Sequence, residues 1–503
     1  MIHMKNIMQR KNIIRLISVI ISQLFLFAFF LCSDHTNGFT IIAGKDTSAS
    51  GAVMVAHNED AAGKNLIVDA HIIPPNVHLS GEVIAVKNNP TIPQVSMTYG
   101  FLWIQIASID FSDSYINRKG IVMTSNACKS REDRPEFTAG GIDFFLPRLA
   151  VERAESAREA VEIAGQLVET YGYYDSGRSY AIADANEAWL LQIVSGKHWV
   201  AQRVPNDQAA VTANGYTITA VNLEDKKNFL GSADLVEYAV KRKWYQPDRD
   251  GPFNFAKVYS APEVIENKKN TLRRWRALNL LSKNNYKLNL PIPFAFPVPK
   301  KSIKLTDLFR VLRDHYENTE YDVTDEYKKG SPNATINRTI CTDTTRYSFI
   351  AELRADFPSE IANRIWIAFR RPDSNAYSPW YASMLVLPDG YTIESFTSTF
   401  HNYLPLQQNP VTLTPDYAYW HYAKLSALVD QDYKSRIKPV IKEWENFEDY
   451  TIKSLKKTEK EFDYLLKTDK YIAGKIITNY IHHLDYRKWF LTVQLIRAIS
   501  TPK

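Results

Sequence analysis

Segments of strand character and segments of helix character follow one another in this sequence in an order that limits the folds open to it. Residues 39–57 consist of FTIIA, a GKDTSASG turn and AVMVAH, so glycine, aspartate and serine separate two apolar runs. These residue types tolerate the tight backbone of a turn, and the pattern predicts that a β-hairpin opens the folded chain. Alternating β-branched, aromatic and polar residues predict further strands at 79–86, 120–124, 179–183, 188–194, 199–203 and 209–212.

Helical periodicity appears first at 147–172, where apolar residues recur three and four apart up to Gly172. This spacing predicts an amphipathic helix with a glycine C-cap. We predict more helices at 234–245, 270–282, 305–315 and throughout 417–503, strands at 347–353, 365–368 and 382–386, and a proline-rich extended connector at 291–299. Hairpins, then helices, then strands and terminal helices indicate an α+β fold in which helices cover the sheets.

Composition and charge narrow the class of protein. With 45% hydrophobic and 23% charged residues, the chain has the profile of a water-soluble globular protein and not of a disordered chain, a collagen or a polytopic membrane protein. Its formal net charge of +6 suggests an anionic partner, but four Lys and Arg and one Asp in residues 1–37 account for half of it, leaving 6 − 3 = +3 for residues 38–503. We therefore expect no nucleic-acid partner.

The first 37 residues are predicted to be a leader. Residues 16–32 carry no charge and follow a stretch with four basic residues, which is typical of a secretory signal peptide. A membrane anchor is the alternative, since this run is near the shortest that spans a bilayer, and lipid modification of Cys32 is another. We predict an exported protein, periplasmic or extracellular, with membrane contact only through an uncleaved leader. A main domain is expected at 38–416, with a helical insertion at about 230–320, and a C-terminal helical region at 417–503.

The sequence contains few of the motifs that identify catalytic or metal-binding sites in other proteins. Three cysteines are too few for a disulfide framework, although one bridge between Cys128 and Cys341 stays open. Nucleotide-binding loops, CxxC pairs, HExxH helices and GxSxG turns are absent from the sequence. Neighbours on a helix point to different faces, so His482 and His483 predict no metal site, and we expect no cofactor. We interpret the basic run at 273–276 as the solvated face of a helix. The alternative is that these arginines bind an anionic group.

A compact polar cluster closes the first hairpin. Its second strand delivers His57, Asn58, Glu59 and Asp60 near the start of the folded chain. The segment NGFTIIAGKDTSASGAVMVAHNED at 37–60 resembles the N-terminus of bacterial dipeptidases of the N-terminal-nucleophile hydrolase superfamily, relatives of choloylglycine hydrolases and penicillin V acylases. More segments are similar to that family, at 111–133, 140–165, 176–205, 311–322 and 338–354, so the resemblance spans about 38–480.

The resemblance implies an αββα four-layer sandwich and the hydrolysis of a small peptide. In that family an N-terminal cysteine attacks the amide carbon while its own α-amine, with an ordinary pKa of about 7.7–8, serves as the base. Asp60 matches the acid that orients the amine, Asn214 the oxyanion asparagine, and Asn126 a second polar contact there. His57, where relatives often have arginine, and Asn58 are placed at the substrate. Without the resemblance, Asn58, Asp60 and Asn214 are equally typical of turns.

Gly38 occupies the place of the nucleophile. Counting back from Gly44 to the family's cysteine leads to position 38, where this chain has no side chain to attack with. Three interpretations stay open: an active dipeptidase of which this sequence is a variant, an inactive exported homologue that binds peptides, and a related amidase with another nucleophile, such as a hydroxyl residue. Cys128 and Cys341 are internal and supply no α-amine. A small peptide is the expected partner, and the sequence leaves a homo-oligomer open.

Overall fold

The computed structural model describes residues 36–63, 66–86, 91–107, 109–265, 267–282, 284–322, 324–334, 338–392 and 417–500. The predicted leader lies outside these residues except for Thr36 and Asn37, and Cys32 lies outside them too. Within these ranges, no helix combines the length and the apolar character needed to cross a membrane.

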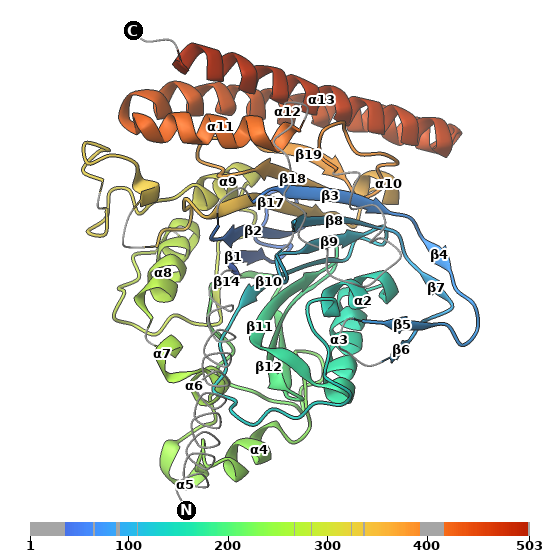
Figure 1. The fold of residues 1–503 in the computed structure, drawn as a ribbon, viewed down its shortest axis with the longest axis vertical. Helices are drawn as coiled ribbons and strands as arrows, with labels where there is room; N and C mark the ends of the chain where they lie inside the picture. The colour runs from blue at the N-terminus through green and yellow to red at the C-terminus, as the bar shows by residue number, and fades with distance from the viewer. Residues whose placement is uncertain are drawn as a thin grey trace, which may run out of the picture.

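Two antiparallel β-sheets form the centre of the molecule (Figure 1). The seven-stranded sheet has the order β16-β14-β1-β2-β17-β18-β19, and the eight-stranded sheet has the order β15-β13-β12-β11-β10-β9-β8-β3. The strands of the first sheet are β1 (Thr36–Ala43), β2 (Val53–Ala61), β14 (Gln208–Thr212), β16 (Ala295–Pro297), β17 (Thr345–Leu353), β18 (Asn363–Phe369) and β19 (Ser378–Tyr381). Those of the second are β3 (Val68–Ile73), β8 (Phe101–Ile106), β9 (Ser114–Asn117), β10 (Val122–Ala127), β11 (Tyr173–Ala183), β12 (Ala188–Gly196), β13 (Trp199–Val204) and β15 (Phe229–Gly231). Two small ribbons pair β4 (Asn76–Val77) with β7 (Met97–Thr98) and β5 (Val83–Ala85) with β6 (Thr91–Pro93).

Helices cover the outer faces of the two sheets (Figure 1). The eight-stranded sheet is covered by α2 (Leu146–Arg153) and α3 (Ala157–Tyr171), and the seven-stranded sheet by α8 (Lys268–Ser282) and α9 (Leu305–Leu312). Three long C-terminal helices lie beside β18 and β19: α11 (Ala418–Gln431), α12 (Tyr433–Thr468) and α13 (Lys470–Ser500). The short helices are α4 (Leu235–Lys241), α5 (Pro247–Asp250), α6 (Phe255–Tyr259), α7 (Pro262–Ile265) and α10 (Ser359–Ala362).

Three apolar cores separate four layers. Successive side chains of a strand point to opposite faces, and β1 shows this directly: Ile41 shares a core with Leu308 of α9, whereas Ile42 shares the core between the sheets with Leu190 of β12. The third core joins the eight-stranded sheet to Val161 of α3. Helices, sheet, sheet and helices follow in that order, which confirms the expected αββα arrangement.

The local patterns predicted most strands near Gly38 correctly. The first hairpin is present, with Gly38 opposite Glu59 and Thr40 opposite His57. The predicted helix at 147–172 is instead two helices, because the hydroxyl of Ser156 accepts a hydrogen bond from the backbone N–H of Glu159 and caps a new start. The strand predicted at 79–86 is only Val83–Ala85.

The predicted strand at 382–386 is wrong. The strand in this region is β19, which lies earlier because its side chains are tied to the C-terminal helices. Ser378 donates a hydrogen bond to Asp485 at 2.6 Å, and the Tyr381 hydroxyl donates one to Glu459 at 2.6 Å. The chain then turns at Met384, whose N–H donates to the carbonyl of Tyr381. These partners are distant in sequence, so the local pattern does not contain them.

Candidate active site

Position 38 lies within a strand and not at its first residue. Along β1, Asn37 pairs with Asp60 of β2, and Gly38 pairs with Glu59. Gly38 is buried, and its carbonyl accepts a hydrogen bond from Nη1 of Arg273 at 3.1 Å. The backbone at the expected nucleophile position is therefore held by a strand on one side and by an arginine on another.

The space for a side chain at position 38 is filled by its neighbours. An ideal Cβ on Gly38 would lie 2.8 Å from Cε1 of His57, 2.8 Å from Nδ2 of Asn126 and 3.2 Å from the carbonyl oxygen of Ser125. Carbon atoms in favourable contact are about 3.5–4.0 Å apart, so a larger residue fits only if His57 and Asn126 move. The place where the resemblance puts a thiol is closed.

Four buried polar side chains form a hydrogen-bonded chain beside Gly38. Oγ1 of Thr40 lies 2.7 Å from Oδ1 of Asn126 and 2.8 Å from Nδ1 of His57, whose Nε2 lies 3.0 Å from Oε2 of Glu59. Burial lowers the pKa of His57 to about 3 and raises that of Glu59 well above its ordinary value. Because Thr40 donates to Asn126, its oxygen accepts from Nδ1–H of His57. The other nitrogen of a neutral His57 carries no proton, so Glu59 donates to it from a protonated carboxyl group.

Asp60, the expected amine-orienting acid, is already bonded on both oxygens. Nη2 of Arg338 donates to Oδ2 at 2.6 Å, and the Thr345 hydroxyl donates to Oδ1 at 2.6 Å. Asp60 is buried, while the Arg338 side chain is 20% exposed. Asp60 pairs across the sheet with Asn37, the residue before Gly38, and its side chain lies on the face of β2 opposite to those of His57 and Glu59.

Arg273 belongs to this site, which corrects the interpretation of the run at 273–276 as a solvated face. Arg273 is 1% exposed and donates to Gly38, to Oδ1 of Asn214 at 2.8 Å and to Oδ1 of Asn270 at 3.0 Å. Burial, with the nearby charge of Arg338, lowers the pKa of Arg273 to about 9. The rest of the run also points inward: Arg274 donates to the carbonyl of Val211, and Arg276 pairs with Asp314.

The other predicted site residues are placed as follows. Asn58 lies on the opposite face of β2 from His57 and donates to the carbonyls of Leu312 and Ile340, both at 2.9 Å. It therefore ties the end of α9 to the segment before β17, and its amide N–H groups are not free for a substrate. Asn214 follows β14 and donates to the carbonyl of Ala127 at 3.1 Å. Asn58 and Asp60 lie within β2, so the alternative of a hairpin turn is wrong for both.

Neither described cysteine replaces the missing nucleophile. Cys128 and Cys341 are both free and buried, so the disulfide left open by the sequence is absent. Burial raises the pKa of the Cys128 thiol to about 12, and it also raises that of Cys341. A thiolate is the nucleophilic form of cysteine, so these environments oppose attack by either residue.

The proteins of related sequence reported next are all described as dipeptidases. A probable dipeptidase of Latilactobacillus sakei is 26% identical over 411 residues, which cover 78% of this chain and 81% of the relative. A probable dipeptidase of Salmonella dublin is 29% identical over 363 residues, with 69% and 81% covered, and Dipeptidase A of Lactobacillus helveticus is 26% identical over 382 residues, with 71% and 77% covered.

Two solved structures are similar at low TM-score. They are penicillin V acylase from Agrobacterium tumefaciens, with 11% identity, 68% and 85% covered and a TM-score of 0.31, and conjugated bile acid hydrolase from Clostridium perfringens, with 14% identity, 69% and 92% covered and a TM-score of 0.34. The family model described as Peptidase family C69 matches residues 38–446, a match that begins at Gly38 and covers most of the sequence. The chain therefore belongs to peptidase family C69.

Proposed function

We propose that this chain binds short peptides at a dipeptidase-type site around Gly38 and does not cleave them by attack of a thiol. The observation that carries the proposal is at position 38, where glycine stands and a Cβ would lie only 2.8 Å from side-chain atoms of His57 and Asn126. Loss of the nucleophile in a serine protease costs about 10⁶-fold in turnover. Without a side chain at position 38, this chain lacks the nucleophile of the thiol route.

Unpaired buried donors support a peptide as the ligand. Among the residues that the structure describes, Nε of Arg338 and Nδ2 of Asn126 are buried without an acceptor. Each such group costs about 1–3 kcal/mol until an acceptor is supplied. The positive charges of Arg273 and Arg338 act on the single carboxylate of Asp60, which leaves one positive charge in surplus. A dipeptide offers a terminal carboxylate and an amide carbonyl, the acceptors that these donors lack.

Isothermal titration calorimetry with a panel of unprotected dipeptides tests the proposal. We expect binding of at least one dipeptide without release of amino acids. Arg338→Met removes the donors at nearly constant length and is expected to weaken binding about 10–150-fold, since a hydrogen bond to a charged group contributes about 1.5–3 kcal/mol. The matched control is Arg249→Met, an exposed arginine of α5 paired with its neighbour Asp250. No heat of binding from any dipeptide, or an equal loss in the control, would count against a peptide site here.

A second candidate function is amide hydrolysis with Thr40 as the nucleophile. Thr40, His57 and Glu59 place a hydroxyl, an imidazole and a carboxyl group in the order found in hydrolytic triads. Oγ1 of Thr40 lies 2.8 Å from Nδ1 of His57, and Nε2 of His57 lies 3.0 Å from Oε2 of Glu59. Against it, all three side chains are buried and the Thr40 proton is directed to Asn126. Dipeptide turnover by the native chain that Thr40→Val abolishes, and that the equally buried Thr451→Val retains, would favour this candidate.

Export and removal of the leader complete the proposal. The family match begins at Gly38, which supports processing just before this residue. We expect N-terminal sequencing of the protein recovered from the periplasm or medium to start at Gly38. A cell-associated protein that retains residues 1–37 would instead indicate a membrane anchor.

A further inference from the structure

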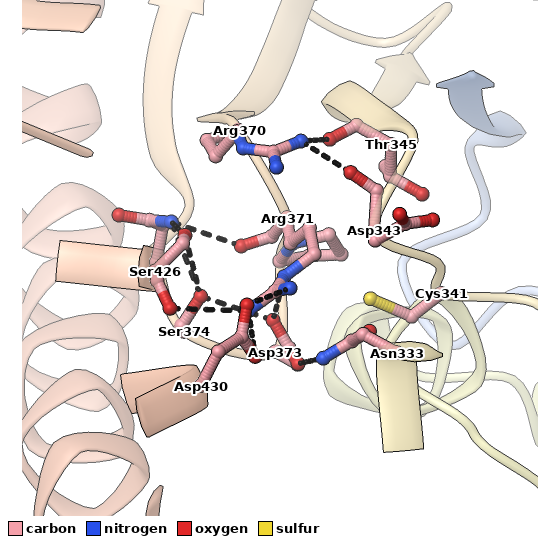
Figure 2. A network of polar contacts seen from close by, with 12 residues as sticks. Asn333, Cys341, Asp343, Thr345, Arg370, Arg371, Asp373, Ser374, Ser426 and Asp430 are labelled. Atoms are coloured by element: carbon pink, nitrogen blue, oxygen red, sulfur yellow. Dashed lines mark hydrogen bonds and ion pairs between the residues drawn. The ribbon is translucent and has the colours of Figure 1, made fainter. Parts of the chain in front are cut away.

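A cluster of metal-ligand side chains lies apart from Gly38, where three loops of the chain meet. His315 follows α9, Cys341 precedes β17, and Asp373 follows β18. All three residues are buried, and one ligand atom from each lies within 4.8 Å of the other two. Figure 2 shows the sulfur of Cys341 on the side that faces Arg371 and Asp373. The topology thus brings together the nitrogen, sulfur and oxygen ligands that transition metals use in proteins.

His315 is held in the way that metal-binding histidines usually are. Its Nδ1 lies 3.0 Å from Oε1 of Glu317, whose other oxygen accepts from the backbone N–H of His315 at 2.8 Å. The Tyr327 hydroxyl also donates to Oε1, at 3.0 Å. The ring is therefore fixed with Nε2 toward Asp373, whose Oδ2 is 3.6 Å away, beyond hydrogen-bond distance. A carboxylate on the outer nitrogen is the common partner of a ligating histidine.

Asp373 and Asn333 complete the cluster on the side of Nε2. Oδ1 of Asp373 accepts from Nε of Arg371 at 3.3 Å, and Oδ2 accepts from Nδ2 of Asn333 at 2.9 Å (Figure 2). Oδ2 also accepts from the Tyr433 hydroxyl at 3.1 Å. Oδ1 of Asn333 lies 3.1 Å from Nε2 of His315. Ligating carboxylates are usually hydrogen-bonded in this manner, and the amide oxygen is placed to act as a fourth ligand.

An ion has a route to the cluster. A cavity of about 850 Å³ lies between α9 and α12, and His315, Glu317 and Asp373 are part of its wall. An entry path of this kind is one of the features that a metal site requires.

We propose that His315, Cys341 and Asp373 bind a divalent transition-metal ion of the zinc class, with Asn333 or a water as the fourth ligand. Sulfur, imidazole and carboxylate ligands lie about 2.0–2.3 Å from zinc, so in a tetrahedron they are about 3.5 Å apart. The ligand atoms are now up to 4.8 Å apart. The side chains therefore close by about 1 Å when the ion binds.

The ion would position the segment 338–345, whose side chains donate hydrogen bonds to Asp60. Cys341 lies between Arg338 and Thr345, the two donors to Asp60, and its N–H donates to the carbonyl of Asp314. Binding at Cys341 fixes this loop against the segments after α9 and β18. The role is structural, because the three ligands are not part of the hydrogen-bonded chain beside Gly38.

Cobalt spectroscopy of the full chain tests the site. After treatment with a chelator, one equivalent of Co²⁺ is expected to give a thiolate-to-cobalt charge-transfer band and the visible bands of tetrahedral cobalt, both lost on addition of Zn²⁺. Cys341→Ser is expected to remove the charge-transfer band. Cys128→Ser, at a second buried free cysteine, is expected to keep it. Glu317→Gln is expected to keep the band and to weaken Co²⁺ binding about 10–100-fold.

Three results would overturn the metal site. The first is a native chain without a thiolate band, and the second is a band that survives in Cys341→Ser. The third result applies if Cys341→Ser does not fold. In that case Zn²⁺ is expected to raise the thermal unfolding midpoint of the native chain and of Cys128→Ser. No rise in either protein would mean that His315 is a protonated member of an ion-pair network and not a metal ligand.

Discussion

Adding a single methyl group at position 38 tests the closure of the nucleophile position. In Gly38→Ala, the new Cβ would lie 2.8 Å from Cε1 of His57 and from Nδ2 of Asn126. Neither neighbour moves freely, because Thr40 is hydrogen-bonded to both of them at 2.8 and 2.7 Å. Overpacking of this kind costs about 1–3 kcal/mol of unfolding free energy, and we expect a loss in this range.

Chemical denaturation measures this cost against a matched control. Gly474→Ala in α13 places a Cβ no closer than 3.9 Å to Leu385, and it is expected to stabilise the chain by about 0.5–1 kcal/mol. In a double-mutant cycle, Gly38→Ala with His57→Ala should cost less than the sum of the single changes by at least about 0.5 kcal/mol. A Gly38→Ala chain as stable as the native one, or no coupling to His57, would refute the closed site.

Further predictions concern the hydrogen-bonded residues around Gly38. Burial lowers the pKa of His57 from 6.5 to about 3, so its contribution to stability is present above pH 6.5 and is lost as the pH falls below 6.5. Burial raises the pKa of Glu59 above 4.5, so its contribution to stability is present below pH 4.5 and is lost as the pH rises above 4.5. Between pH 4.5 and 6.5, denaturation should therefore show His57→Gln losing stability and Glu59→Gln gaining it with rising pH relative to the native chain, by up to about 1.4 kcal/mol per pH unit; parallel profiles would contradict the neutral pair. Asp60→Asn should lower the unfolding free energy by about 1–3 kcal/mol through the bond to Arg338, and an unchanged denaturation midpoint would show that this pair is not formed. In a dipeptide assay, Gly38→Cys alone should remain inert for lack of room, while Gly38→Cys with His57→Ala should gain turnover; activity in the single variant would contradict the closure.

The architecture was largely predictable from local patterns. Alternation in residues 39–57 places Gly38, Thr40 and His57 on one face of a hairpin once the turn is assigned, and the observed register agrees. The hydrogen bond between Thr40 and His57 could therefore have been anticipated from the period of two alone. The strand at β19 was missed because its place is set by Asp485 and Glu459 on the C-terminal helices.

The roles of several charged residues depend on contacts between distant segments. Arg273 has the sequence context of a surface helix, and only the packing of α8 against β1 brings it to the carbonyl of Gly38. His315, Cys341 and Asp373 come from three separate loops, with no spacing that predicts a ligand set. Local composition cannot supply these assignments, because each depends on which loops meet at one end of a sheet.

Release of free amino acids from unprotected dipeptides distinguishes a dipeptidase-type site that only binds peptides from one that cleaves them. The chain starting at Gly38 should be assayed at peptide concentrations that saturate binding in calorimetry. We expect bound peptide and no release of amino acids above the rate without protein. Turnover by the native chain in the usual enzymatic range, about 1–10³ s⁻¹, would contradict this expectation.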